Sequence, residues 1–346
     1  MNGGRGMRDW KFHDKKNRGK VRLWGSGEQT RTYRKSCRSM AAVCFLSVFS
    51  LCLGGCAAKA QEPSGEEFTI GVVTKSGSSE YWMSVRAGME KAAREYDVQV
   101  VIFSPDTEAD KEIQKKMIRD LLKMEVDALA VSPIDSYDNR DYIDLADRKG
   151  IPVYSYDTPV RDADLPYIGI DNAKAGYELA RVLAGKMGHR GNIAVIAGSK
   201  EQASHGERID GFRRYMEGEP DIHIGVIKDG YSNLRVSEQE MEEIQSTYPD
   251  LDGIMTTSAV TALGLAEATR DTGIAIASVD DQEDAIRAVE EGRITVLGAQ
   301  SGYDIGYETV TYIVNEKNGL EQEHEKILDT EILTQENVRD YQNLKK

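Results

Sequence analysis

Polar side chains follow six apolar runs of the chain, each at the point where the run ends. Hydroxyls, carboxylates and amides dominate these segments, and such groups donate to and accept from a polar ligand. The pattern suits a small polyhydroxylated molecule held by hydrogen bonds. The six segments are Thr74-Lys75-Ser76, Ser132-Pro133-Ile134-Asp135, Asp157-Thr158, Thr257-Ser258, Asp280-Asp281 and Gln300-Ser301.

The elements that must position these groups alternate along the chain. Apolar runs typical of buried strands are separated by segments with helical spacing, which predicts parallel sheets covered by helices on both faces. The predicted strands are Phe68–Val73, Val98–Phe103, Ala128–Ser132, Pro152–Tyr156, Tyr167–Ile170, Ile193–Ala197, Ile222–Ile227, Gly253–Thr257, Ile274–Val279 and Thr295–Ala299. The predicted helices include Lys111–Lys123, Asn139–Lys149, Asn172–Met187 and a stripe from Trp82 to Tyr96.

Two sheets are favoured over one, because a single open sheet of ten or more strands would be unusually wide. The predicted fold class is α/β, with two doubly wound parallel-sheet lobes. Parallel sheets bind ligands outside the carboxyl ends of their strands. The six polar segments are therefore expected to meet in one site.

Motifs for catalysis or metal binding do not emerge from the sequence. The five histidines are scattered and form no i, i+4 pair for zinc. There is no Gly-x-Ser-x-Gly elbow and no phosphate-binding loop ending in Gly-Lys-Ser/Thr. We therefore expect a binding protein without a metal or cofactor, and not an enzyme.

The N-terminal segment 1–56 has the pattern of a secretory signal. Four basic residues stand shortly before an uncharged stretch, residues 40–56, which is too short to span a bilayer as a helix. It ends in Leu53-Gly54-Gly55-Cys56, which resembles the lipobox of bacterial lipoproteins and implies cleavage before Cys56 and lipidation of its sulfur. A buried apolar segment with a chance cysteine is the alternative, but the polar residues 57–66 that follow favour an exposed linker.

Charge and cysteine content agree with export. All four cysteines lie within residues 1–56, so the mature chain keeps one and has no disulfide framework. Residues 1–39 carry 12 basic and 3 acidic side chains, which leaves 32 basic and 55 acidic after them, a net charge of −23. A body this acidic repels nucleic acid. The basic start is interpreted as an overlong signal region or as an upstream start, with Met7 or Val21 as the true one.

Several short motifs, in order, resemble the type I solute-binding proteins of ABC importers, the ribose- and galactose-binding group. The resemblance covers about residues 67–340. It implies two lobes, 67–171 with 301–330 and 172–300 with 331–346, joined by a three-strand hinge near Asp171-Asn172, Gln300-Ser301 and Asp329-Thr330. The motifs are Ile70–Val73 with Glu80–Trp82, Gly150–Tyr154, Ile170–Asn172, Glu207–Phe212, Ser278–Asp280 and Gly298–Gln300.

The same resemblance implies which side chains contact the ligand. An aromatic pair, Tyr81 and Trp82, would pack on sugar C–H groups. Two carboxylates, one arginine and one hinge glutamine would take the hydroxyls. The full set implied for the site is Lys75, Ser79, Tyr81, Trp82, Ser132, Asp157, Thr158, Arg208, Ser258, Asp280 and Gln300.

Plainer interpretations stand beside these. Trp82 also continues the apolar stripe of its helix, and an aspartate before a helix is often its N-cap; we favour that role for Asp135 and Asp281. Lys75 stands where a small polar residue is usual, and would face an anionic ligand or, more simply, pair with a cleft aspartate such as Asp135.

Departures from the family pattern argue against ribose itself. Serines 79, 132 and 258 stand where ribose binders have amides, and Thr158 stands where they have a second arginine. Fewer fixed donors therefore face the ligand.

The expected function is a lipid-anchored, extracytoplasmic and monomeric receptor. It would close on a sugar-like solute and deliver it to an ABC permease in the cell membrane. A sensory protein that reports to a histidine kinase or chemoreceptor shares the fold and the cleft, and neighbouring genes would separate the two. A sugar-responsive repressor is rejected, because a signal segment replaces the DNA-binding helices and the body is acidic.

Overall fold

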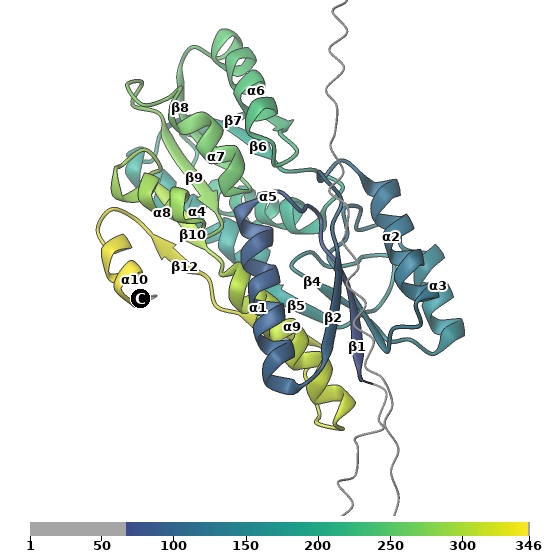
Figure 1. Ribbon diagram of the computed structural model, residues 1–346. Coiled ribbons are helices and arrows are strands. Elements are labelled where there is room, and N and C mark those ends of the chain that lie inside the picture. The colour runs from purple at the N-terminus through teal and green to yellow at the C-terminus, as the bar shows by residue number, and fades with distance from the viewer. Residues whose placement is uncertain (1–66, 345–346) are drawn as a thin grey trace, which may run out of the picture. The chain divides into compact units, whose positions relative to one another are not determined.

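The computed structural model describes residues 67–344. The predicted signal segment 1–56 with Cys56, the linker 57–66 and the last two residues lie outside this range. Within it, two six-stranded sheets each carry helices on both faces (Figure 1). The predicted fold class, two doubly wound parallel-sheet lobes joined by a three-strand hinge, is confirmed.

The first sheet has the order β11-β5-β4-β3-β1-β2, with all neighbours parallel. Its strands are β1 (Thr69–Val73), β2 (Gln99–Phe103), β3 (Ala128–Val131), β4 (Val153–Tyr156), β5 (Tyr167–Ile170) and β11 (Glu325–Leu328). The helices of this lobe are α1 (Glu80–Tyr96), α2 (Lys111–Lys123), α3 (Arg140–Lys149) and α9 (Gly302–Lys317).

The second sheet has the order β12-β10-β9-β8-β6-β7 and is parallel except for β12, which runs antiparallel to β10. Its strands are β6 (Gly191–Ala197), β7 (Ile222–Asp229), β8 (Leu251–Thr256), β9 (Ala275–Val279), β10 (Val296–Ala299) and β12 (Glu331–Leu333). The helices are α4 (Asn172–Lys186), α5 (Ala203–Met216), α6 (Leu234–Thr247), α7 (Ala259–Ala266), α8 (Glu283–Glu290) and α10 (Val338–Leu344).

The central strands are apolar on both faces because each face packs against helices. In β1, Ile70 and Val72 join the core under α1 and α9, whereas Val73 joins the core under α2 and α3. In β6, Ala194 and Ile196 alternate in the same way with their neighbours between the two cores of the second lobe. A near-continuous apolar run is therefore what a strand in this position requires.

The chain passes between the sheets three times. It leaves the first sheet after β5 and enters α4, returns after β10 into α9, and crosses again between β11 and β12. The strand ends that face these crossings are the ones followed by polar segments. Within residues 67–344 no helix is long and apolar enough to cross a membrane.

Some element boundaries differ from the expectation. The strand predicted to end at Ile227 continues to Asp229, and the helix predicted from Asn139 begins one residue later. The short segments β11, β12 and α10 were not expected as elements. Strand β11 is largely exposed at a sheet edge, so its residues lack the apolar pattern of a buried strand.

Helices α4 and α5 approach each other closely enough to require glycine. A Cβ atom at Gly211 would lie 1.8 Å from the Ala173 carbonyl oxygen, and one at Gly176 would lie 1.9 Å from that of Arg208. Neither position leaves room for a larger residue. This contact fixes α5, and with it Arg208, against the crossover helix.

Candidate functional site

A cavity of about 360 Å³ lies between the two lobes, at the carboxyl ends of the strands. The first lobe contributes the loop after β1, the start of α1 and the loop after β2. The second lobe contributes the loop before α6, the start of α7 and the residues after β9. The lining residues are Ser76, Ser78, Ser79, Glu80, Tyr81, Trp82, Asp106, Thr107, Glu108, Tyr231, Ser232, Asn233, Leu234, Ser258, Val260, Leu263, Asp280 and Gln282.

Beside this cavity, Lys75 forms a buried ion pair with Asp157. The ammonium nitrogen lies 3.1 Å from Oδ2 of Asp157, and the two residues are 4% and 3% exposed. The same ammonium donates to the Thr158 hydroxyl at 2.9 Å and to Oε1 of Gln202, in the second lobe, at 2.6 Å. It also lies 5.5 Å from the centre of the Trp82 ring. Lys75 therefore links both lobes.

The Asp157 carboxylate is contacted by four donors of the protein itself, three at Oδ2 and one at Oδ1. Besides Lys75, it accepts from the hydroxyls of Tyr81 at 2.6 Å and of Ser132 and Thr158 at 3.0 Å. A carboxylate offers about four lone-pair sites. Burial alone would raise the pKa of Asp157, but the Lys75 charge and these donors hold it below its ordinary value.

Arg208 stands in the first turns of α5 and holds three elements together. Its Nε donates to Asn172 Oδ1 at 2.9 Å, its Nη1 to the Thr257 carbonyl at 2.7 Å and its Nη2 to Gln300 Oε1 at 3.1 Å. These bonds use three of five N–H donors. Arg208 thus joins the first and second crossings to the end of β8.

Asp280 follows β9 in a left-handed backbone conformation (φ 89°), as Asp157 follows β4 (φ 60°). Non-glycine residues rarely adopt this region, and such strain concentrates at functional sites. The Asp280 carboxylate accepts from the Ala259 amide at 3.1 Å and from Gln300 Nε2 at 2.7 Å. Burial raises its pKa to about 6, although Arg208 opposes the shift.

Tyr81 and Trp82 both line the cavity and also form hydrogen bonds within the buried network. Both rings line the cavity, but both are also largely buried and pack edge to face. Trp82 Nε1 donates to Glu108 Oε1 at 3.2 Å, and Glu108 Oε2 accepts from Gln202 at 3.1 Å. Burial, followed by the charges of Asp157 and Asp280, raises the pKa of Tyr81, so its hydroxyl stays a donor.

The structure brings all eleven predicted site residues into this region, in two sets. Five line the cavity and six form the hydrogen-bonded network beside it. The lining set is Ser79, Tyr81, Trp82, Ser258 and Asp280. The network set is Lys75, Ser132, Asp157, Thr158, Arg208 and Gln300.

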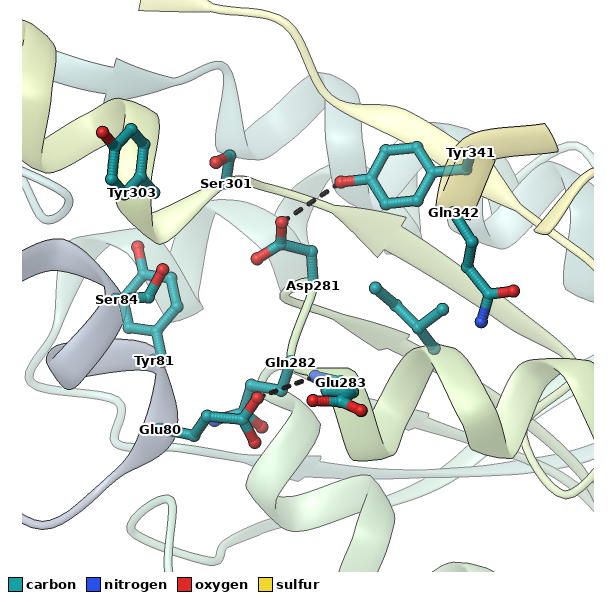
Figure 2. A pocket seen from close by; sticks show the side chains of 11 residues that line it. Glu80, Tyr81, Ser84, Asp281, Gln282, Glu283, Ser301, Tyr303, Tyr341 and Gln342 are labelled. Atoms are coloured by element: carbon teal, nitrogen blue, oxygen red, sulfur yellow. Dashed lines mark hydrogen bonds between the residues drawn. The ribbon is translucent and has the colours of Figure 1, made fainter. Parts of the chain in front are cut away.

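Lys75 pairs with a cleft aspartate, as the plainer interpretation expects, but the partner is Asp157. Asp135, the example named for that role, accepts from the Tyr137 amide in a tight turn. Two expectations about helix caps are wrong. Asp135 and Asp281 are not helix N-caps, because α3 is capped at Asn139 and α8 at Gln282. Asp281 instead accepts from the Tyr341 hydroxyl at 3.1 Å (Figure 2).

A second cavity, of about 520 Å³, adjoins the first and shares Glu80, Tyr81 and Gln282 with it. Figure 2 shows that residues of α1, of the start of α8 and of the C-terminal segment surround it. Glu80 Oε1 accepts from the Glu283 amide at 2.8 Å and so ties α1 to the start of α8 across the lobes. Glu80 thus stands at the boundary of the two cavities.

Four buried or half-buried residues of the site were not predicted: Glu108, Gln202, Ser204 and His205. The last three lie beyond the loop that follows β6, at the N-cap and in the first turn of α5, so a rule based on residues directly after strands does not identify them. Ser204 lies 2.8 Å from the Thr158 hydroxyl. Burial, then the charges of Lys75 and Arg208, lowers the pKa of His205, which stays neutral. Glu108 lies in the polar loop directly after β2, a strand end of the same kind that the sequence-based prediction did not use.

Comparisons with known proteins agree with this architecture. The ribose import binding protein of Bacillus subtilis is 26% identical over 244 residues, 70% of this chain and 79% of that protein. A solute-binding protein of an ABC transporter from Actinobacillus succinogenes, solved with bound D-allose, superposes with a TM-score of 0.73 at 22% identity, covering 79% of this chain and 99% of that one. The XylFII–LytSN complex contains a chain that superposes equally well, with a TM-score of 0.73 at 23% identity over 79% and 99% of the two chains.

The family model of the periplasmic binding protein domain matches residues 70–321. This range contains both sheets up to β10, all three predicted carboxylate and arginine positions of the site and the crossover helices α4 and α9. The chain therefore belongs to the periplasmic binding protein family.

Proposed function

We propose that this protein captures a sugar or sugar-like small molecule between its two lobes and delivers it to an ABC importer. The observation that carries the proposal is the interlobe cavity. Its walls come from both lobes, and it lies against a buried network of polar side chains. The ribose and allose binders among its relatives point to the same class of ligand.

The chemistry beside the cavity suits hydroxyl recognition. Asp280 lines the cavity and accepts one hydrogen bond on each oxygen, which leaves capacity for ligand hydroxyls. Arg208, next to it, keeps two N–H donors. The rings of Tyr81 and Trp82 supply apolar surface for sugar C–H groups. Among the described residues around the cavity, none is arranged as a nucleophile with a base, and we propose binding without catalysis.

Capture depends on closure, because the bonds that cross the cleft exist only when the lobes meet. Besides Lys75 with Gln202, these bonds include Thr158 with Ser204 at 2.8 Å and the Ala203 amide to the Ser136 hydroxyl at 2.9 Å. A ligand that touches both lobes favours this closed state over an open one. The permease would recognise the closed state.

A second candidate function is sensing, in which the closed form docks on a membrane kinase. The specific observation is the likeness to the XylFII chain of the XylFII–LytSN complex. Neighbouring genes distinguish the two: a permease with an ATPase supports import, and a kinase pair supports sensing. Loss of solute uptake on deletion, with kinase signalling unchanged, would support import.

The location proposed is the outer face of the cell membrane, with one monomer tethered through a lipid on Cys56. The support is the sequence of residues 1–56, with its basic flank, its short uncharged stretch and its terminal Leu-Gly-Gly-Cys. A single acyl chain binds membranes only marginally, so two or three chains are expected at this cysteine.

The test of capture is a thermal-shift screen against pentoses, hexoses, amino sugars and polyols, followed by calorimetry on the best compound. At 100 times its dissociation constant, a ligand that binds only the folded protein stabilises it by about 2.7 kcal/mol. We expect at least one neutral or amino sugar to do so. A flat screen across all of these compounds would remove the sugar-binding function.

A further inference from the structure

Among residues 67–344, the charged side chains that line the cleft cavity are all acidic. Its carboxylates belong to Glu80, Asp106, Glu108 and Asp280. The two cations of the cleft lie outside the lining. Lys75 is paired with Asp157, and Arg208 donates to an amide oxygen of the first crossing, a backbone carbonyl and Gln300. The space left for a ligand is therefore negative.

Among residues 67–344, no cation is hydrogen-bonded to Glu80, Glu108 or Asp280. Three of the carboxylates accept from neutral groups: Glu108 from an indole and an amide, Asp280 from a backbone amide and Gln300, and Glu80 from a backbone amide. None of these partners carries a positive charge. Glu80 and Asp106 are exposed, so the argument rests on half-buried Glu108 and on buried Asp280, whose charge Arg208 compensates only in part. Burial of an incompletely compensated carboxylate is costly, and a cation brought by a ligand lowers that cost.

A buried acceptor in the same wall points the same way. Oε1 of Gln282 is buried and has no hydrogen-bond partner among residues 67–344, and Gln282 as a whole is 5% exposed. It lines the cavity next to Asp280. Buried polar atoms normally have a hydrogen-bond partner, so a donor on a molecule in the cavity would complete the bonding of this oxygen. Asp280 has capacity for further donors as well.

The neighbouring corner of the cleft already holds an ammonium group. The Lys75 nitrogen lies among a carboxylate, a hydroxyl, an amide oxygen and the face of Trp82. These are the groups that bind ammonium ions in proteins. Trp82 also lines the cavity, together with Tyr81 and Tyr231. The cavity thus combines carboxylates, unused acceptors and aromatic rings, the set that suits a cation with several donors.

Building on the proposed sugar capture, we propose that the cleft selects a cationic sugar-like molecule, a small polyol that carries a protonated amine. The ammonium group lies against Asp280 and Glu108 and supplies three donors, with no acceptor to be left unsatisfied. The hydroxyls take the remaining acceptors of the lining. Acid sugars are excluded, because their carboxylate would meet like charges and find no basic side chain in the lining.

Matched sugars test this selection directly. Calorimetry at pH 7.0 on the mature chain would compare D-glucosamine, D-galactosamine and D-mannosamine with their parent hexoses and with D-glucuronate and D-galacturonate. We expect at least one amino sugar to bind at least about tenfold more tightly than its parent hexose, because a charge-assisted hydrogen bond is stronger than a neutral one. The uronates should show no binding.

Two isosteric variants and one control locate the effect. In Glu108→Gln and in Asp280→Asn, the ratio of amino-sugar to parent affinity should fall toward one, whatever happens to the absolute affinities. Asp144→Asn removes the same charge from an exposed position on α3 and should leave that ratio unchanged. Melting temperatures of the three variants identify any that fails to fold, and the remaining variant then decides.

The outcomes separate the two levels of the argument. Parent hexoses or uronates that bind as tightly as the amino sugars overturn the selection and leave sugar capture standing. A preference for amines that survives in both Glu108→Gln and Asp280→Asn overturns the assignment of these carboxylates. Absence of binding in every series removes the proposed sugar capture itself, and the inference with it.

Discussion

Replacing Lys75 with methionine should lower the melting temperature of the empty protein strongly. The change removes one partner of a buried ion pair and leaves the Asp157 carboxylate, 3% exposed, without its adjoining cation. Breaking such a pair costs about 3–5 kcal/mol. At ~2–4 °C per kcal/mol for a domain of this size class, the expected loss is on the order of 10 °C.

The double variant Lys75→Met with Asp157→Asn provides the decisive comparison. It removes both charges, and asparagine can still accept from the Tyr81 hydroxyl. The double variant should therefore be more stable than the Lys75→Met variant, with a coupling energy of ~1–3 kcal/mol between the two sites. Calorimetric melting of the four proteins at pH 7 measures this coupling. Losses that simply add would refute the account of Lys75 as the charge partner of Asp157.

Three further predictions concern other parts of the molecule. Burial raises the pKa of Asp280 to about 6 from 3.8, so the folded protein holds this proton more tightly than the unfolded chain. The protonated Asp280 therefore stabilises the fold at pH 4, and this stabilisation is lost as the pH rises through 6. Melting temperatures between pH 4 and 8 should show this trend in the parent but not in Asp280→Asn. Gly211→Ala should destabilise the protein by about 1–3 kcal/mol because its Cβ would strike the facing helix, whereas Gly206→Ala in the same helix, with open space around it, should be neutral or stabilising; equal effects would contradict the close packing. In cell fractionation, Cys56→Ser should release the protein or leave it unprocessed, and a mature-sized, membrane-bound variant would exclude the lipid anchor.

The fold was predictable because its buried strands form continuous apolar runs in the sequence. In β1, Ile70 and Val73 face opposite hydrophobic cores, so both faces of the strand must be apolar. Such a strand is recognised in the sequence as an apolar run without alternation. Strand β11 was missed because its residues lie at an exposed edge. Edge strands are set by pairing with a neighbour and not by their own periodicity.

The sequence predicted where the site lies better than it predicted the individual side-chain contacts within it. Strand ends of parallel sheets converge, so residues as distant as Asp157 and Asp280 had to lie near one another. The sequence did not identify Asp157 as the partner of Lys75, because that pairing depends on the direction of the Lys75 side chain in the folded protein. Contacts such as Glu108 with Gln202 depend on how two separately folded lobes meet, and no local pattern records that geometry.

Small-angle scattering with and without ligand tests the central claim, that the solute is bound between the lobes by their closure. The sugar that stabilises the protein most in the thermal screen would be used at saturation. Moving the lobes from 1:99 to 99:1 in favour of the closed state takes ~5.5 kcal/mol of differential affinity. The account predicts a smaller radius of gyration in the complex than in the empty protein. Identical scattering curves at saturation would contradict it and leave a static pocket in place of a closing cleft.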